Sequence, residues 1–277
     1  MRETIFRLIE TGDNFVKYAA DGRQERAATR ARRKFERAAE LAGESGDLEM
    51  LELARLRLED LERRHERPVV AADVEAQPGA EEVSVAEPPQ GRDRVPPGQR
   101  VPKGWPVLHE GPIPPFDPAA WRLSVWGAAQ QPLELTYEEV KAFPNVTMAS
   151  DFHCVTGWSR LDNRWLGVRA RDVLGRARPD GARHALVHAD YGYTANLPIA
   201  TLLEEDALLA WGHDGRDLEP KHGWPLRLVV PKLYGWKSVK WVRGFELLEH
   251  DRRGFWEVRG YHNRADPWRQ ERYAYQE

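Results

Sequence analysis

The 277-residue sequence predicts an α+β fold, and three observations favour this class. The chain opens with a stretch rich in Ala, Leu, Glu and Arg, which are residues that favour helices. Short apolar runs typical of strands follow, interleaved with short helical patterns but without the regular alternation of a parallel βαβ sheet. Neither the GxGxxG nor the GxxxxGK[ST] pattern occurs, which argues against the common nucleotide-binding folds.

The first region, residues 1–66, is predicted to form an α-helical hairpin or small bundle. A helix is expected over Thr4–Ala19. Small and apolar residues then recur at helical spacing over Ala31–Ala42, until Gly43-Glu44-Ser45-Gly46 breaks the pattern. Asp47 can cap the next helix, whose apolar stripe runs over Leu51–Leu61. This helical pair resembles one tetratricopeptide-type unit, which would make it an adaptor for another protein.

Residues 67–95 are predicted to be a flexible linker. The stretch contains Pro, Gly, Glu and small residues without periodicity, so it cannot bury enough apolar surface to order itself.

The main domain is predicted over residues 96–277, which hold all 11 tryptophans. Indole rings bury a large area, so they fit a well-packed core. Thr136-Tyr137-Glu138-Glu139 has the form of a capping box that opens a short helix. Alternation and apolar runs predict strands over 121–126, 185–188, 193–198, 226–230 and 241–248.

Composition excludes several classes of function. Lys and Arg total 41 against 44 Asp and Glu, so no global basic field exists for nucleic acid. The Arg-rich stretch over 23–34 is interleaved with acidic residues and indicates a solvated helix face. No apolar run approaches the length of a membrane span. The first residues lack an apolar signal core and a twin-arginine pair, which predicts a cytoplasmic location.

The single cysteine, Cys154, lies in the polar stretch Asp151–Arg160. One cysteine excludes a disulfide framework and a multi-cysteine zinc site within one chain. Cationic neighbours favour the thiolate, the form that binds soft metals. Two alternatives remain: a buried, inert thiol, and a nucleophile for which His153 would have to act as the base.

A second group of polar residues flanks the apolar run Leu226–Val230. His222-Gly223-Trp224-Pro225-Leu226-Arg227 precedes it, and Gly235-Trp236-Lys237-Ser238-Val239-Lys240 follows it. Arg offers a planar fork for phosphate, Lys offers a point charge, and turn amides complete an anion site. The alternative is a strand with solvated charged ends. Asp190 is either a turn residue or an acceptor for a polar heterocycle.

These segments resemble the molybdopterin-binding domain of the sulfite oxidase and nitrate reductase family, in particular its short bacterial members. The resemblance rests on the HGxPxR pattern at 222–227, the apolar strand ending at Pro231, the SxK-type turn at 238–240 and the Asp151–Ser159 segment. It covers about 96–273 and implies a sulfite-oxidase-type fold with mixed sheets and a molybdenum-molybdopterin cofactor. Cys154 would ligate the metal, and the expected cofactor contacts are His109, Asp190, His222, Arg227, Ser238, Val239 and Lys240.

The sequence departs from the family pattern just after the cysteine. Sulfite oxidases carry paired arginines there, whereas Arg160 is the nearest arginine in this chain. The resemblance therefore implies a two-electron oxygen-atom transfer on a small oxyanion or a sulfoxide-type substrate, with Arg160 as a substrate-binding residue. With no heme-attachment motif, electrons are expected to pass to a separate partner. The N-terminal helices are expected to contact a protein. The alternative function is a non-catalytic cofactor-binding scaffold with a helical adaptor.

Overall fold

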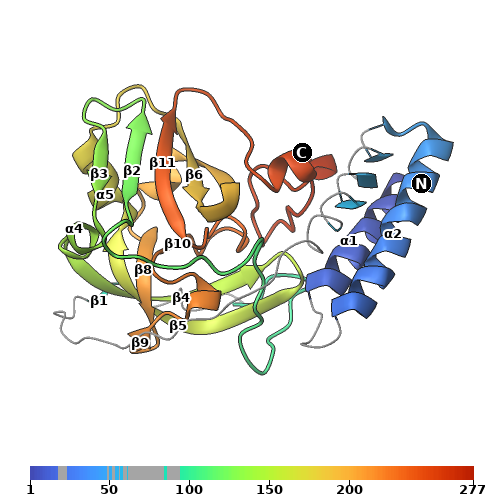
Figure 1. Cartoon of the computed structure of the whole chain (residues 1–277), viewed down its shortest axis with the longest axis horizontal. Helices are drawn as coiled ribbons and strands as arrows, with labels where there is room; N and C mark the ends of the chain where they lie inside the picture. Colours follow the sequence, from blue (N-terminus) through green and yellow to red (C-terminus); the bar gives the residue numbers. More distant parts are fainter. Residues whose placement is uncertain are drawn as a thin grey trace. The chain divides into compact units, whose positions relative to one another are not determined.

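The structure, a computed structural model, divides the chain into two compact units, residues 1–71 and 72–277. It describes residues 1–17, 24–48, 50, 51, 54, 55, 57, 58, 61, 84, 85 and 94–277 (Figure 1). Most of the predicted linker, 67–95, lies outside these residues, so its flexibility and the predicted domain boundaries stay predictions. Among the described residues, no helix combines the length and the apolar character that crossing a bilayer requires.

The N-terminal unit contains helices α1 (Arg2–Lys17) and α2 (Gln24–Ser45). The two pack closely, because a Cβ added at Gly12 would lie 2.4 Å from the Phe35 ring. The helix break predicted over Gly43–Gly46 starts three residues later, because α2 runs to Ser45 and the left-handed backbone begins at Gly46, with a φ of +68°. Burial of Ala42 holds the last turn in the helix and outweighs a glycine penalty of about 1 kcal/mol. The cap predicted at Asp47 is confirmed, since its carboxylate accepts the Met50 N–H at 3.2 Å.

The main unit contains two mixed sheets, which confirms the predicted α+β class (Figure 1). In the described residues the first sheet has the order β1 (Ser84–Val85), β4 (Asn145–Cys154), β5 (Trp158–Arg169), β8 (Leu208–His213) and β10 (Arg227–Val229), with β9 (Arg216–Asp217) on β8. The second has the order β3 (Leu133–Leu135), β2 (Leu123–Gly127), β11 (Val242–Leu248), β6 (His184–Ala189) and β7 (Thr194–Pro198). The β1–β4 and β2–β11 pairs are parallel and the others are antiparallel.

Short helices connect the strands. The capping box predicted at Thr136 is confirmed at the start of α4 (Tyr137–Lys141), where Thr136 Oγ1 accepts the Glu139 N–H and Glu139 accepts the Thr136 N–H. The other short helices are α5 (Ala170–Ala177), α6 (Ile199–Leu202), and the 3₁₀ turns η1 (Asp190–Gly192), η2 (Pro220–His222), η3 (Glu257–Arg259) and η4 (Ala274–Gln276).

The largest apolar core takes side chains from both sheets and from α4, α5 and α6. A second cluster gathers Phe152, Cys154, Trp158 and Trp165 with Val229 of β10. Since Val168, Leu209 and Leu228 of the same sheet belong to the first core, the sheet is apolar on both faces. The second cluster contains Cys154, and the candidate site is built around it.

Candidate functional site

Cys154 ends β4 at a tight turn into β5. Its side chain is 8% exposed, and Sγ lies 3.1 Å from Thr156 Oγ1. The turn closes with a hydrogen bond from the Gly157 N–H to the Cys154 carbonyl at 3.1 Å. Gly157 has a φ of +86°, a conformation that residues with a Cβ rarely adopt.

The Cys154 turn is held from two distant parts of the chain. On one side, Gln99 donates to the Cys154 carbonyl at 3.1 Å, and Arg100 exchanges backbone hydrogen bonds with Gly157 and Ser159. On the other side, the Arg272 guanidinium donates to the Val155 carbonyl. The turn is therefore fixed in place before any ligand binds.

His153 does not fit the role of base for Cys154. Successive residues of a strand point to opposite faces, and both residues belong to β4. His153 Nδ1 lies 2.9 Å from Ser159 Oγ. Burial lowers the pKa of His153 to about 4, so the ring is neutral at neutral pH. The nucleophile alternative therefore has no support in this geometry.

Arg227 is a buried cation beneath three aromatic rings. Its guanidinium carbon lies 5.2 Å from the Trp165 ring centre and 5.3 Å from that of Phe152. It donates to the carbonyls of His222 at 2.8 Å and Ser238 at 3.2 Å. Burial lowers the pKa of Arg227 to about 9, so it remains charged at neutral pH. Its Nε is buried with no hydrogen-bond partner among the described residues.

Lys240 is the second buried cation. Its Nζ donates to the carbonyls of Leu108 at 2.8 Å and Lys221 at 2.7 Å. Burial lowers the pKa of Lys240 well below its ordinary value, the charge of Arg227 lowers it further, and the Cys154 thiolate raises it. The structure therefore brings Cys154, Arg227 and Lys240 within electrostatic reach of one another.

The turn between β10 and Lys240 is anchored to the strand. Ser238 Oγ accepts the Val230 N–H at 2.9 Å, and the Val239 carbonyl accepts the Leu228 N–H at 2.7 Å. Lys237 in the same turn has a different role. Its Nζ donates to Glu257 at 2.7 Å and to both oxygens of Asn196 at 2.8 Å, so all three protons are engaged.

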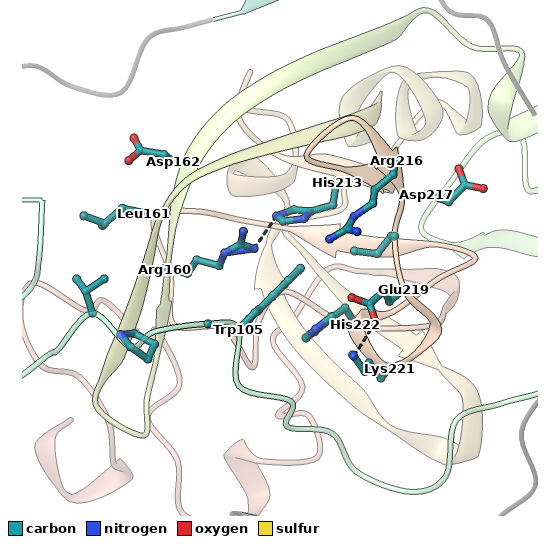
Figure 2. Close-up of a pocket in the computed structure, with 14 residues that line it drawn as sticks. Trp105, Arg160, Leu161, Asp162, His213, Arg216, Asp217, Glu219, Lys221 and His222 are labelled. Carbon is teal, nitrogen blue, oxygen red and sulfur yellow. Dashed lines mark hydrogen bonds and ion pairs between the residues drawn. The ribbon is translucent and has the colours of Figure 1, made fainter. Parts of the chain in front are cut away.

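A pocket of about 640 Å³ opens beside this cluster (Figure 2). Trp105 lies between Arg160 and His222 in this view. Its indole stacks on the His222 ring with centres 3.7 Å apart and planes 6° apart, and the Arg160 guanidinium carbon lies 4.9 Å from the indole centre. His213 also lines the pocket. Cys154, Arg227 and Lys240 do not line it, and Trp105 lies between the pocket and Arg227, at 5.9 Å from the latter.

The charges of the pocket are balanced. The residues that line it include three basic ones, Arg160, Arg216 and Lys221, and three acidic ones, Asp162, Asp217 and Glu219. Arg160 also donates to Asp214 at 2.7 Å and lies 3.1 Å from His213 Nε2, while Lys221 pairs with Glu219 at 2.6 Å. The pocket therefore offers hydrogen-bond donors without a net positive charge.

Two buried histidines at the pocket have lowered pKa values. Burial lowers the pKa of His213 to about 4, and Asp214 raises it in part. Burial and then the charges of Lys240, Arg227 and Lys221 lower the pKa of His222 to about 2. Both rings are neutral at neutral pH. His222 Nδ1 is buried without a hydrogen-bond partner among the described residues.

The predicted site residues thus fall into three groups. Six lie in or directly beside the buried cluster: Cys154, His222, Arg227, Ser238, Val239 and Lys240. Arg160 lines the pocket together with His222. His109 and Asp190 line neither. The Asp190 carboxylate accepts Arg243 Nε at 2.9 and 3.0 Å, and His109 Nδ1 lies 2.9 Å from the Gly111 carbonyl.

Sequence analysis missed Trp105, His213 and Asp214. Trp105 and His213 are 108 positions apart, and their ring centres lie 4.4 Å apart. No spacing pattern in the sequence connects them, because the contact depends on the loop 96–105, which pairs with β5 where Arg100 meets Trp158. A signal did exist for Asp214, since Asp214-Gly215 is typical of a hairpin turn.

Comparisons with known proteins identify relatives of this chain. Residues 110–256 match the family described as oxidoreductase molybdopterin binding domain. The uncharacterized oxidoreductase YuiH of Bacillus subtilis is 48% identical over 184 residues, covering 66% of this chain and 93% of YuiH. The protein-methionine-sulfoxide reductase catalytic subunit MsrP of Campylobacter jejuni is 29% identical, covering 51% of this chain and 54% of MsrP. The sulfite oxidase of Arabidopsis thaliana is 28% identical, covering 55% of this chain and 48% of that enzyme.

The family match covers more than half of the chain, and YuiH is matched over nearly its whole length. The chain spans about half the length of MsrP and of the sulfite oxidase. The expected cofactor, molybdenum-molybdopterin, and the expected enzyme class are confirmed by the family. The chain belongs to the sulfite-oxidase-like family of molybdopterin-dependent oxidoreductases.

Proposed function

We propose that this enzyme transfers an oxygen atom from a small, neutral, sulfoxide-type substrate and receives two electrons from a separate partner. The observation that carries the proposal is the charge-balanced pocket beside a buried thiol and two buried cations. Cys154 anchors the metal, and Arg227 and Lys240 hold the phosphate of the pterin. His222 and the backbone of Ser238 and Val239 support the same group.

The buried cluster has the chemistry that this cofactor requires. A thiolate is a soft ligand suited to the metal. Arg227 Nε and His222 Nδ1 are buried polar atoms without hydrogen-bond partners in the part of the chain that the structure describes, which is costly unless a ligand uses them. Lys240 engages two carbonyls and has three protons. Cofactor contacts by His109 and Asp190 stay predictions, because neither residue belongs to the cluster.

The cofactor, when bound, supplies the two-electron redox chemistry, and the chain supplies placement and electrostatics. Arg160 donates a hydrogen bond to the oxygen of the substrate in the pocket. Asp214 and His213 hold Arg160 in this orientation. Trp105 lines the pocket and packs edge-to-face on Trp165, and this apolar wall lowers the access of water, which strengthens the hydrogen bond that Arg160 donates.

The charge and the volume of the pocket favour a neutral substrate over sulfite. Asp214 compensates the charge of Arg160, so an anion would gain little from the pocket while losing its own hydration. The volume of about 640 Å³ exceeds what a small oxyanion fills and falls in the range of about 300–1,000 Å³ for organic ligands. The name of the MsrP relative, a methionine-sulfoxide reductase, supports the same choice.

The metal site is tested by elemental analysis of the purified protein. Cys154→Ser is expected to lose most of its molybdenum, because a hydroxyl is a poor ligand for a soft metal. Thr147→Ser, a conservative change on the same strand, is the control and should retain the metal. Equal molybdenum per chain in Cys154→Ser and wild type would remove Cys154 from the site.

The substrate is tested with dimethyl sulfoxide, methionine sulfoxide, sulfite and nitrate, with reduced or oxidised viologen as electron carrier. Arg160→Met is expected to lower kcat/KM about a hundredfold on the sulfoxides, the size of effect seen when a donor to the reacting oxygen is lost. Arg164→Met, an exposed change on the same strand, should leave it unchanged. Asp214→Asn removes the negative charge that compensates Arg160. The ratio of kcat/KM for sulfite to kcat/KM for the sulfoxides should therefore rise. Faster wild-type turnover with sulfite than with any sulfoxide would contradict the proposed substrate class.

A separate electron partner and a cytoplasmic location complete the proposal. The MsrP relative is named a catalytic subunit, which supports a reaction shared between proteins. Cell fractionation tests the location. The alternative, a non-catalytic scaffold, would be favoured if the metal-loaded protein showed no redox change with any donor.

A further inference from the structure

We propose that the loop carrying Trp268 is the face on which an acidic one-electron carrier protein docks and through which electrons reach the site. The inference rests on the proposed function, because it takes Cys154 as the metal anchor. The partner's position follows from an exposed aromatic side chain, a rigid loop and a short path to Cys154.

Trp268 is 40% exposed, and two exposed arginines lie close to it in the sequence. Arg269 directly follows Trp268 and has a side chain 65% exposed, and Arg264 lies four positions before it. Exposed Trp and Arg are the residue types most enriched at protein interfaces and at their energetic hot spots. This combination of residues fits a protein partner better than a solvated surface.

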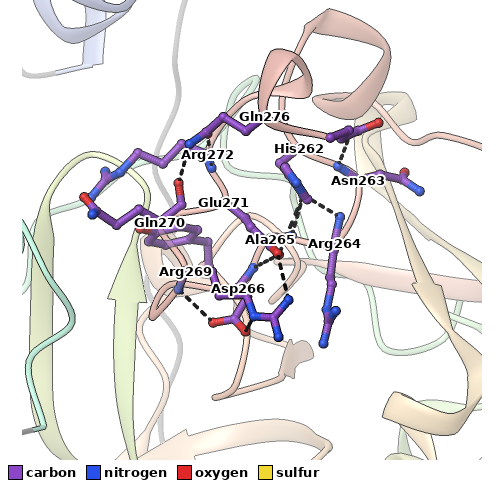
Figure 3. A network of polar contacts seen from close by, with 12 residues as sticks. His262, Asn263, Arg264, Ala265, Asp266, Arg269, Gln270, Glu271, Arg272 and Gln276 are labelled. Atoms are coloured by element: carbon purple, nitrogen blue, oxygen red, sulfur yellow. Dashed lines mark hydrogen bonds and ion pairs between the residues drawn. The ribbon is translucent and has the colours of Figure 1, made fainter.

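The loop is held rigid by its own side chains although it contains little regular structure (Figure 3). The Asp266 carboxylate accepts the Trp268 N–H at 2.9 Å, and Glu271 accepts the Asp266 N–H at 3.0 Å. His262 Nδ1 accepts the N–H groups of Arg264 at 3.0 Å and Ala265 at 3.3 Å. The exposed indole is therefore preorganised, which reduces the entropy lost when a partner binds.

The indole lies next to the residue that precedes the proposed metal ligand. The ring centres of Trp268 and His153 are 6.0 Å apart in an edge-to-face arrangement. His153 is buried and is joined to Cys154 by one peptide unit. The path from the surface to the thiol therefore consists of two aromatic rings and a covalent link.

The chemistry of the partner follows from the charges and from the electron count. Arg269 lies 3.8 Å from Asp266 and 3.9 Å from Glu271, so these two carboxylates compensate its charge. Arg264 is exposed at the same loop, and its charge favours a carrier with an acidic surface around its redox group. Each encounter oxidises one carrier by one electron. Two encounters supply the two electrons that, with two protons, convert a sulfoxide into a sulfide and water.

The test uses metal-loaded protein without substrate, mixed anaerobically with reduced flavodoxin, an acidic one-electron carrier. Trp268→Ala is expected to lower the second-order rate of flavodoxin oxidation about tenfold or more at unchanged molybdenum content, the size of a lost interface hot spot. Leu203→Ala is the matched control, because Leu203 is also 40% exposed and lies on α6. It should react at the wild-type rate. Arg264→Glu should slow the reaction at low salt, with the difference shrinking as salt rises.

Reduced methyl viologen serves as a second donor that needs no docking face, and Trp268→Ala should accept its electrons at the wild-type rate. An unchanged flavodoxin rate in Trp268→Ala would overturn the inference. So would a wild-type protein that accepts electrons from viologen but not from flavodoxin, and the proposed function would then still stand. Wild-type protein that lacks metal and is reduced by neither donor would overturn the proposed function itself.

Discussion

Trp105 connects the two parts of the candidate site. It stacks on His222, which lines the pocket, and it lies 5.9 Å from Arg227 in the buried cluster. The Trp105 indole is therefore in contact with His222 at the pocket and near Arg227 in the buried cluster. The aromatic surface that contacts His222 and lies near Arg227 therefore comes from Trp105, a residue that belongs to none of the motifs found in the sequence.

The buried histidines make the stability of the metal-free protein depend on pH. In the folded state the pKa is about 4 for His213 and about 2 for His222, against about 6.5 for an unfolded chain. Below pH 6.5 the unfolded chain therefore binds protons that the folded chain does not. The two histidines therefore leave the free energy of unfolding undiminished above pH 6.5. As the pH falls from 6.5 towards 4, the free energy of unfolding decreases by about 1.4 kcal/mol per pH unit for each histidine.

Urea unfolding of the metal-free protein at pH 7, 6 and 5 measures this slope. His222→Gln should reduce the slope by the contribution of one histidine, and His250→Gln, at an exposed position, serves as the control. A slope that His222→Gln leaves unchanged would contradict the assignment.

At the residue scale, the roles of Cys154, Arg227 and Lys240 came from the family resemblance, because the residue types alone left an inert thiol and a strand with solvated charged ends as alternatives. The structure places the three side chains within electrostatic reach of one another, and their roles stay predictions. Lys237 is also a lysine and lies in the same turn as Lys240. Its ammonium, however, donates its hydrogen bonds to Glu257 and Asn196. Sequence cannot separate two such lysines, because the difference depends on partners 20 and 41 positions away.

At the scale of elements, β5 and β8 approach each other closely at Gly167. A Cβ added there would lie 2.1 Å from the Leu209 carbonyl oxygen. Gly167→Ala should therefore destabilise the fold by about 1–3 kcal/mol or more, as overpacking does. Gly175→Ala is the matched control, because Gly175 lies in α5 and its added Cβ would meet nothing within 4 Å. It should stabilise the fold by about 0.5–1 kcal/mol. Thermal unfolding distinguishes the two, and equal shifts would contradict the close approach.

The start of α4 gives a second prediction for an element. Thr136→Ala removes the side chain that caps the Glu139 N–H and should lower the free energy of unfolding by about 1 kcal/mol. Molybdenum content should not change, because α4 contributes no residue to the site. Glu134→Ala, on the neighbouring strand, is the control. A Thr136→Ala protein as stable as wild type would show that the cap is dispensable.

The sequence predicted five strands of the main unit but missed the other six, β1, β3, β4, β5, β8 and β9. The five found are β2, β6, β7, β10 and β11, each displaced by one or two residues at an end. The β5 segment carries Arg160, Asp162, Asn163 and Arg164, which hide its alternation. Asn163 is nonetheless buried, because its amide donates to the carbonyls of Ser150 and Arg160. Tertiary hydrogen bonds of this kind cannot be read from local pattern.

At the scale of the whole molecule, the described site residues all belong to the unit 72–277. Removing residues 1–66 should therefore leave the molybdenum content and the rate with reduced viologen unchanged. The N-terminal helices are predicted to contact a protein, so the truncated chain should lose a partner in pull-downs. Identical partner sets for the two chains would contradict this role, and a loss of molybdenum would show that the helices support the site.

The hydrogen bonds that Gln99, Arg100 and Arg272 make to the Cys154 turn bear on the order in which the site is completed during synthesis. A ribosome releases the chain from its N-terminus at roughly 5–20 residues per second, so Cys154 emerges well before the segment that contains Arg272. Until Arg272 emerges, the Val155 carbonyl lacks the guanidinium that completes the turn. We therefore expect the metal centre to load only after Arg272 has emerged, and a nascent chain stalled before residue 272 should bind less molybdenum.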